Sequence, residues 1–404
     1  MRRAAWGILL LYVFAVPWEY SLDLGAPLGN IARILGIVLM LVAIPAALRR
    51  GMLRRPGAMQ WAAIALYLWV WCGLFWTIDQ AVTLEKVRGY IQEMMVVWIA
   101  WEFAENERDF GTVVRAMIAG CWVLGILTLW SAVSPGASAL GQIRFAAFGQ
   151  DPNDVARYLD LGFPLAALLI DEDRWLPSRW MAVGYFPMGV AAVLLTASRG
   201  GFVEALVALA GCSILLWRKH RSAVLGSVWI SPVPAACIWM LLPPMVLQRI
   251  STIPQQLMGG NLNHRLNIWS AGWEAFKRAP ILGFGAGTFV DAAGTAPVDT
   301  AHNSALSILV EMGVVGLIFA SLVLVLAVRA ALRSRGPKRT ALLTALSVWL
   351  IASMVGTATE SRTTWLLFAM ASLAGRLATE NQGKETEWKV RAGCPRGERA
   401  EAVL

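Results

Sequence analysis

Apolar runs of about 20 residues recur along most of the chain, and they constrain its fold more than any other feature. A run of that length is what an α-helix needs to cross the hydrocarbon core of a bilayer. Of the 404 residues, 57% are hydrophobic and 15% are charged, whereas a soluble domain is about 45–50% apolar and about 25% charged. A membrane β-barrel would alternate apolar and polar residues in ~10-residue segments. The sequence therefore predicts an all-α polytopic membrane protein and argues against a soluble enzyme, a disordered chain or a secreted disulfide scaffold.

Twelve transmembrane helices are expected from these runs. The first run is short and follows Arg2 and Arg3, so a signal peptide is the alternative. No A-x-A cleavage site follows it, which favours an uncleaved helix. The expected spans are Ala4–Trp18, Leu28–Leu48, Ala58–Thr77, Arg88–Ala104, Thr112–Val133, Val155–Ile170, Trp180–Ala197, Gly200–Trp217, Ala223–Met245, Asn303–Val328, Ala341–Ala358 and Thr363–Leu377.

The charge pattern predicts the orientation of these spans. With both termini in the cytoplasm, the largest basic clusters fall on that side, at 49–55, 218–221 and 329–339, as the positive-inside rule requires. We then expect residues 1–378 to form one transmembrane domain with a long outer loop at about 246–302, and residues 379–404 to form a charged cytoplasmic tail. The five cysteines include no C-x-x-C pair, so neither a disulfide framework nor a zinc site is expected.

Four polar stretches stand out, and the predicted topology places all of them on the outer face. The first is Arg144–Asn153, which ends in Asp-Pro-Asn. Pro152 favours a turn, and Asn153 or Asp154 is suited to cap the helix that follows. A turn with a helix cap is therefore the structural alternative to a functional site.

The second stretch is Ser198-Arg199-Gly200-Gly201, between the seventh and eighth expected spans. Two glycines let a ligand approach the backbone, and a helix N-terminus favours anions. An arginine adds a two-pronged phosphate contact. The stretch therefore favours phosphate binding, and a snorkelling interfacial arginine is the alternative.

The third stretch is the long outer loop. Its apolar residues recur at spacings of four and three from Leu262 to Phe276, which predicts an amphipathic helix on the membrane surface or on the bundle. Arg265 lies beside that stripe, where it is either functional or a surface charge. The glycine-rich run 280–287 follows a helix and lacks the strand–helix context of a dinucleotide site, so we expect a tight turn.

The fourth stretch is Ala301-His302-Asn303-Ser304, at the start of the tenth expected span. A neutral imidazole at a dry membrane boundary can accept a proton near neutral pH. A histidine that only hydrogen-bonds a helix start is the alternative. The intramembrane acids Glu204 and Glu311 are candidate partners for the arginines, although a structural role is the stronger expectation for each.

The order of these motifs resembles that of the O-antigen ligase/polymerase family of bacterial membrane glycosyltransferases. The resemblance covers about residues 144–319, and the first half of the chain is matched only by hydropathy. The family's motifs correspond to G-x-x-x-P-N at Gly149–Asn153, R-G-x-F at Arg199–Phe202, R-x-x-x-W at Arg265–Trp269, P-x-x-G-x-G at Pro280–Gly285, H-N-x-x-L at His302–Leu306 and E-x-G-x-x-G at Glu311–Gly316.

This resemblance implies transfer of a glycan from undecaprenyl diphosphate at the periplasmic face of the bacterial inner membrane. The acceptor would be lipid A–core in a ligase, a carrier-linked glycan in a polymerase, or a protein hydroxyl in an oligosaccharyltransferase. The resemblance assigns His302 as the catalytic base and Arg199 and Arg265 as the diphosphate ligands. Supporting roles are expected for Asn153, Gly200, Gly201, Glu204, Asn303 and Glu311.

The chemistry expected of such a site is an inverting transfer that needs no cofactor. The diphosphate is already a good leaving group, arginines would stabilise the charge that develops on it, and a base would deprotonate the acceptor hydroxyl. The first outer loop holds only Glu19 and Asp23 as acids, so we expect a metal-independent reaction. Nucleic acid is not an expected partner.

Two choices stay open at this point. A ligase is favoured over a polymerase, but both need an outer cavity for a lipid-linked acceptor. A transporter of lipid-linked glycans is the non-enzymatic alternative, and it should place basic residues through the bundle midplane. The distinctive arginines cluster instead at the outer edge, apart from Arg33 and Arg115, which favours an enzyme.

Overall fold

The computed structural model describes residues 1–25, 28–49, 53–134, 144–230, 244–252, 264–296 and 300–391. This part of the chain is helical, and its one β-type contact is an isolated bridge between Asp23 and Asn30. Among the described residues, eight helices are long and apolar enough to cross a membrane: Arg2–Ser21, Ile31–Leu48, Ala58–Phe75, Glu107–Val133, Leu176–Leu195, Arg199–Ser222, Ser304–Arg333 and Gly336–Val355. The all-α membrane class is confirmed, and the count of twelve spans remains a prediction.

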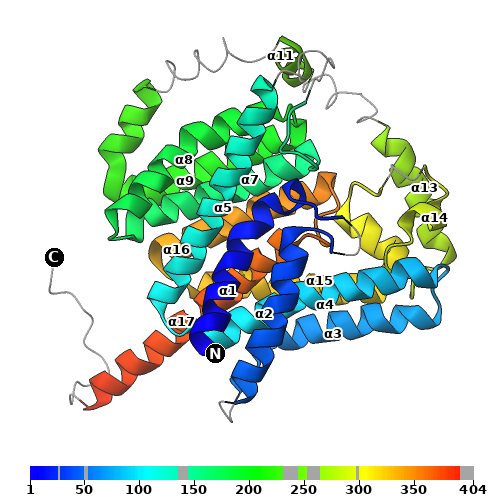
Figure 1. Ribbon diagram of the computed structural model, residues 1–404, viewed down its shortest axis with the longest axis horizontal. Helices are drawn as coiled ribbons and strands as arrows, with labels where there is room; N and C mark the ends of the chain where they lie inside the picture. Colours follow the sequence, from blue (N-terminus) through cyan, green and yellow to red (C-terminus); the bar gives the residue numbers. More distant parts are fainter. Residues whose placement is uncertain are drawn as a thin grey trace.

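The helices pack into a bundle (Figure 1). In chain order they are α1 (Arg2–Ala15), the 3₁₀ helix η1 (Val16–Ser21), α2 (Ile31–Leu48), α3 (Ala58–Cys72), η2 (Gly73–Phe75), α4 (Gln80–Phe103), α5 (Glu107–Val133), α7 (Pro152–Glu172), α8 (Leu176–Leu195), α9 (Arg199–Ile230), α11 (Pro244–Ser251), α13 (Arg265–Arg278), α14 (Phe289–Ala293), α15 (Ser304–Arg333), α16 (Gly336–Val355) and α17 (Arg362–Arg391).

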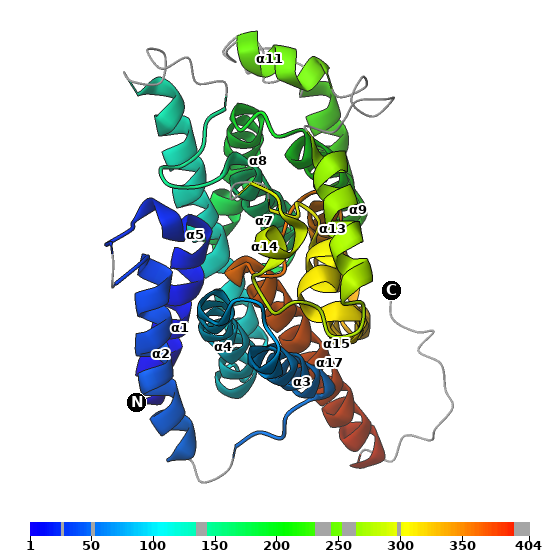
Figure 2. The same cartoon turned by 90° about the vertical axis from the view of Figure 1, so that its right-hand side faces the viewer.

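Eleven of the twelve expected spans coincide with a described helix. The ninth span does so in part: α9 continues to Ile230 past a break at His220, and residues 231–243 lie outside the described part of the chain. Helices α4, α7 and α17 are not among the eight apolar helices, because charged and polar residues interrupt their sequences. Helix α17 extends beyond the expected last span, and its C-terminal part projects from the bundle (Figures 1 and 2).

Asn and Asp side chains begin several helices by accepting backbone N–H groups that have no partner within the helix. Asn30 caps α2, Asp79 caps α4 and Asn106 caps α5. Helix α7 begins in the same way, but its cap is Asp151, which accepts the N–H of Asn153 at 2.7 Å. The expectation that Asn153 or Asp154 is the cap is therefore wrong: Pro152 occupies the first helical position, so the cap is the residue before it, Asp151.

Helix α7 lies inside the bundle and not on its lipid-facing surface. Every residue from Val155 to Leu169 is buried, against α5, α8, α9 and α16. Close packing requires small residues at the crossing with α9, where a Cβ on Gly201 would overlap the Cβ of Ala156. The Tyr185 hydroxyl of α8 donates to the Leu159 carbonyl at 2.7 Å. Since protein surrounds α7, its charged residues lie among partners and away from lipid.

Helix α15 breaks at Gly313, and the glycine-rich turn 280–287 docks into the break. Gly313 has φ 66° and ψ −171°, a conformation that only glycine adopts readily. The turn satisfies the opened backbone: Phe284 N–H donates to Val310 at 3.0 Å, and Gly285 N–H donates to the Glu311 carbonyl at 2.8 Å. Val314 N–H donates in return to Pro280 at 2.9 Å. The expected tight turn is thus fixed to the helix that begins next to His302.

Helix α13 lies beside the first half of α15, together with α14 (Figure 2). It corresponds to the expected amphipathic helix, of which Leu262 lies outside the described residues. The face that packs on the bundle is made by Ile268, Gly272 and Ala275. Leu266 and Trp273 of the expected stripe are 47% and 48% exposed. The buried face of α13 is therefore narrower than the apolar pattern indicates.

Gly283→Ala tests the docked turn. Gly283 has φ +71°, and a Cβ there would lie 2.6 Å from the Met312 amide nitrogen. Gly25→Ala is the matched control, because Gly25 has φ +73° and open space around the Cβ position. We expect Gly283→Ala to cost ~1–3 kcal/mol more stability than Gly25→Ala, measured by thermal unfolding of the purified protein in detergent. Equal losses would mean that the contact with α15 contributes nothing.

Candidate active site

The four polar stretches come together where α7, α9 and α13 begin and α16 ends. A small cavity of about 30 Å³ is lined by residues of the first three stretches, and the fourth adjoins it, because the Ser304 hydroxyl donates to the carbonyl of the lining residue Gly356. That volume has room for a hydroxyl group or a water molecule, so a diphosphate would lie outside it, between the surrounding arginines. The lining residues are Asn153, Asp154, Arg157, Ser198, Gly200, Glu204, Arg265, Ala352, Val355 and Gly356.

Asn153 joins the first stretch to the second. Its Oδ1 accepts from Arg144 Nη2 at 2.7 Å and from the Ser198 hydroxyl at 2.9 Å. Ser198 Oγ accepts in turn from the Gly201 N–H at 3.1 Å, so it caps α9. The side-chain oxygen of Asn153 thus attaches the turn that contains Arg199 to the first turn of α7.

Arg199 and Arg265 are each the first residue of a helix, α9 and α13. Arg199 Nη2 donates to Thr252 Oγ1 at 2.8 Å. Burial lowers the pKa of the Arg265 guanidinium below its ordinary value, the charge of Asp151 opposes that effect, and the charge of Arg199 adds to it. The two guanidinium groups repel each other, and each lies at a helix N-terminus with its own partial positive charge. An anion bound between them would reduce this repulsion.

His302 is held in a strained turn. Its φ is 45°, which is unusual for a residue other than glycine and typical of functional positions. The preceding carbonyl, of Ala301, accepts from Trp269 Nε1 of α13 at 3.0 Å. Asn303 caps α15, with Oδ1 accepting the Leu306 N–H at 3.0 Å. The Ser304 hydroxyl donates to the Gly356 carbonyl at 3.0 Å, so α13 and the residue after α16 hold the chain on both sides of His302.

Asp154 and Arg157 are site residues that the sequence analysis missed as a pair. Arg157 is 4% exposed, its Nη2 lies 2.9 Å from Asp154 Oδ1, and its guanidinium stacks on the Tyr158 ring. Asp154 is also within electrostatic range of His302. Arg157 lies within an apolar run that we interpreted as a transmembrane span. Asp154, three residues before it, could have indicated an ion pair on one face of a helix.

The two expected acidic partners behave differently. Glu204 is 3% exposed and lines the small cavity with Arg157 and Arg265, and its Oε2 has no hydrogen-bond partner among the described residues. Glu311 instead accepts the Gly287 N–H at 2.6 Å and the Ser307 hydroxyl at 2.8 Å. Glu311 therefore holds the turn 280–287, and the pairing with an arginine that we considered for it is not observed.

The two glycines after Arg199 are explained by packing. Gly201 lies against Ala156 of α7, and a Cβ on Gly200 would lie 3.1 Å from Val355 Cγ2 of α16. Larger side chains would push α9 away from both neighbours. The glycines thus let the start of α9 approach α7 and α16, and a ligand contact to their backbone remains a prediction.

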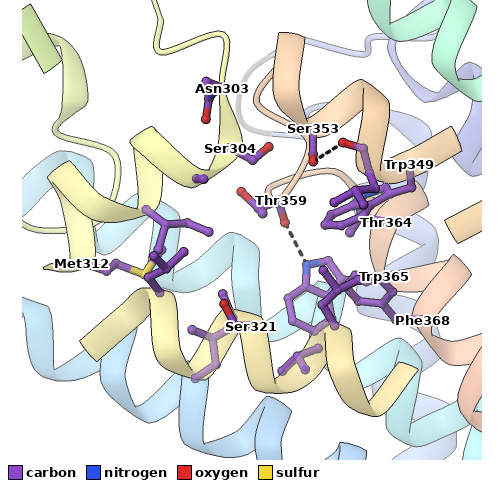
Figure 3. A pocket seen from close by; sticks show the side chains of 18 of the residues that line it. Asn303, Ser304, Met312, Ser321, Trp349, Ser353, Thr359, Thr364, Trp365 and Phe368 are labelled. Atoms are coloured by element: carbon purple, nitrogen blue, oxygen red, sulfur yellow. Dashed lines mark hydrogen bonds between the residues drawn. The ribbon is translucent and has the colours of Figure 1, made fainter. Parts of the chain in front are cut away.

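A second, apolar cavity begins beside His302, at Asn303 and Ser304, and continues between α15, α16 and α17 (Figure 3). It encloses about 200 Å³, and the side chains of Met312, Trp349, Trp365 and Phe368 form much of its wall. Trp365 Nε1 donates to the Thr359 carbonyl at 3.1 Å, which leaves its ring as apolar wall. The cavity is suited to a hydrocarbon chain.

Among the described residues, no group of three or more His, Cys, Asp or Glu side chains is placed to hold a metal ion. The expected metal independence of the reaction remains a prediction.

Comparison with known proteins supports one family. Residues 185–321 match the family model described as O-antigen ligase, a segment that carries Arg199, Arg265 and His302 but not the Gly149–Asn153 turn. No curated protein matches the chain. A solved chain from the study titled "Structural coordination of polymerization and crosslinking by a peptidoglycan synthase complex" is 16% identical, with a TM-score of 0.40, over 81% of this chain and 97% of that one. The family match confirms the resemblance that the motifs indicate: residues 185–321 are similar to the O-antigen ligase family.

Proposed function

We propose that the protein is an O-antigen ligase that moves a glycan from undecaprenyl diphosphate to lipid A–core at the periplasmic face of the inner membrane. The observation that carries this proposal is the convergence of Arg199, Arg265 and His302, from three separate segments, on one end of the bundle. The family match supports a glycosyltransferase of the O-antigen ligase/polymerase type. The finer assignment rests on the arrangement of the site.

The proposed reaction is a single displacement at the anomeric carbon. The acceptor hydroxyl oxygen attacks that carbon, its proton passes to His302, and the bond from the carbon to the diphosphate oxygen breaks with inversion. Arg199 and Arg265 stabilise the charge that develops on the leaving diphosphate. The products are the glycosylated acceptor and undecaprenyl diphosphate.

Asp154 and Arg157 have a positioning role in this proposal. The imidazolium that forms on His302 gains a carboxylate in Asp154, and the ion pair with Arg157 keeps that carboxylate oriented. A carboxylate beside a catalytic histidine stabilises the charged ring in this way. We assign Arg157 its role through Asp154, because that carboxylate is its ion-pair partner.

The apolar cavity beside His302 supports a lipid-linked donor. A prenyl chain lying in it would bring its diphosphate to the same end of α15 at which His302 lies. A polymerase of the same family would use the same geometry with a carrier-linked glycan as acceptor, and a protein oligosaccharyltransferase would use a protein hydroxyl. A transporter would need no base, so the strained His302 turn favours an enzyme.

His302→Ala should lower kcat by ~10²–10⁴-fold, because the acceptor hydroxyl loses its base. The apparent KM for the donor should change little. Asp154→Asn should give a smaller loss in the same direction. The assay is transfer by purified protein, with His220→Ala as the control because His220 lies in α9 next to Asp171. Near-normal transfer by His302→Ala would exclude His302 as the base.

Arg199→Lys and Arg265→Lys keep the charge but lose the two-pronged geometry, so both should weaken donor use, and the Ala variants should weaken it further. We expect a rise in the KM for the donor together with a fall in kcat. Arg179→Lys, at the start of α8, controls for the loss of an arginine elsewhere. If all four variants transfer normally, the two arginines are interfacial anchors.

The acceptor is tested by supplying purified protein with undecaprenyl-diphosphate glycan, with and without lipid A–core, in the presence of EDTA. The ligase assignment predicts product on lipid A–core. Carrier-linked chains that lengthen without lipid A–core would show a polymerase. Loss of activity in EDTA would contradict a metal-independent mechanism.

A further inference from the structure

A basic cavity lies at the other end of α15 from His302, and nothing in the proposed reaction uses it. It encloses about 230 Å³ between the start of α3, the last turns of α15 and the middle of α17. This is the end of the bundle that the charge pattern predicts to be cytoplasmic. The lining residues are Gly57, Ala58, Met59, Gln60, Trp101, Leu326, Arg329, Ala330, Arg333, Ser372, Gly375, Arg376, Thr379 and Glu380.

Arg376 is the buried part of this site. The residue is 8% exposed, its guanidinium stacks on Trp101, and its Nη1 donates to Glu380 Oε1 at 3.2 Å. Its Nε is buried and has no hydrogen-bond partner among the described residues. A buried guanidinium N–H without an acceptor is costly, and an anionic oxygen in the cavity would supply one.

The N-terminus of α3 supplies a second source of positive potential. Gly57 precedes this 15-residue helix and has no side chain with which to cap it. Gln60 Oε1 accepts the Gly57 N–H at 3.0 Å, and Ala58, Met59 and Gln60, which begin the helix, line the cavity. First-turn N–H groups together with the helix dipole form a favourable position for a phosphate.

Arg329 and Arg333 supply the exposed part, one turn apart on α15. Both side chains are exposed, and neither side chain forms a hydrogen bond or an ion pair with another described residue. Glu380 is the one acid in the cavity wall, and it is shared between Arg54 and Arg376. Three arginines against one carboxylate leave the cavity with a net positive charge.

The surroundings point to a lipid as the source of the phosphate. Apolar side chains on the same half of α15 face outward, with Leu322 43%, Val325 46% and Leu332 42% exposed. Acyl chains would lie along that surface while the headgroup enters the cavity. Basic cavities between helices on the cytoplasmic side bind anionic lipid headgroups by this means.

We propose that the cavity between α3, α15 and α17 binds the phosphodiester headgroup of an anionic phospholipid of the cytoplasmic leaflet. The bound lipid would hold the ends of these three helices together. The site is independent of the proposed glycan transfer, so either can fail without the other.

The test is a titration of the purified full-length protein with phosphatidylglycerol, followed by native mass spectrometry. Arg329→Gln/Arg333→Gln removes two exposed cavity charges, and we expect the dissociation constant to rise on the order of ten- to thirtyfold. The matched control is Arg335→Gln/Arg339→Gln, which removes the same charge from the N-cap and first turns of α16, outside the cavity. It should change the constant by less than about threefold.

Three outcomes would overturn the proposal. Equal weakening by both double variants would mean that binding depends on general surface charge. Equal binding of phosphatidylethanolamine would mean that the negative headgroup is not recognised. Displacement of phosphatidylglycerol by inorganic phosphate at the same concentration would show a site for free phosphate.

Discussion

Backbone hydrogen bonds between the turn 280–287 and the break in α15 hold the outer end of the molecule together. In a membrane, a break in a helix is tolerated only where other protein groups satisfy the opened N–H and C=O groups. Here N–H groups of the turn donate to the carbonyls of Val310 and Glu311. The carbonyls of Pro280 and Ile281 accept N–H groups of α15 after the break. The Glu311 carboxylate fixes the end of the same turn at Gly287. These bonds anchor the turn that follows α13 to α15, the helix that begins next to His302.

The site follows from that anchor because its parts lie at helix ends. Arg199 and Arg265 begin α9 and α13, and His302 lies just before α15. Asn153 ties the start of α7 to the start of α9, and Trp269 ties α13 to the carbonyl before His302. A helix N-terminus carries a partial positive charge, so these helix ends add their positive potential to that of the arginines. The proposed phosphate chemistry depends on this geometry more than on any single side chain.

Hydropathy and local motifs were enough to predict the membrane class, most helix positions and the four stretches that meet. Apolar run length is a local property, so it can be read directly from the sequence. The cap of α7 was misplaced by two or three residues because three polar residues surround Pro152. The apolar pattern of α13 predicted an amphipathic helix but not which of its apolar residues would pack on the bundle, and Leu266 is 47% exposed.

Long-range features could not be predicted from one sequence. A structural role was the stronger expectation for Glu311, but its actual partners could not be named, because one of them, the Gly287 N–H, belongs to a turn more than twenty residues away. Arg157 was counted within a span because nothing local shows that α7 is surrounded by protein. The basic cavity joins α3, α15 and α17, whose contacts are set by the fold as a whole.

The most direct test of the account is a cryo-electron microscopy structure of the protein in lipid nanodiscs with undecaprenyl diphosphate. We predict that the two phosphates lie between Arg199 and Arg265, within hydrogen-bond distance of both guanidinium groups, and that the prenyl chain enters the apolar cavity beside His302. Phosphate density at Arg329 and Arg333, with none at Arg199 and Arg265, would contradict the assignment of the active site to the end of the bundle where α9, α13 and α15 begin.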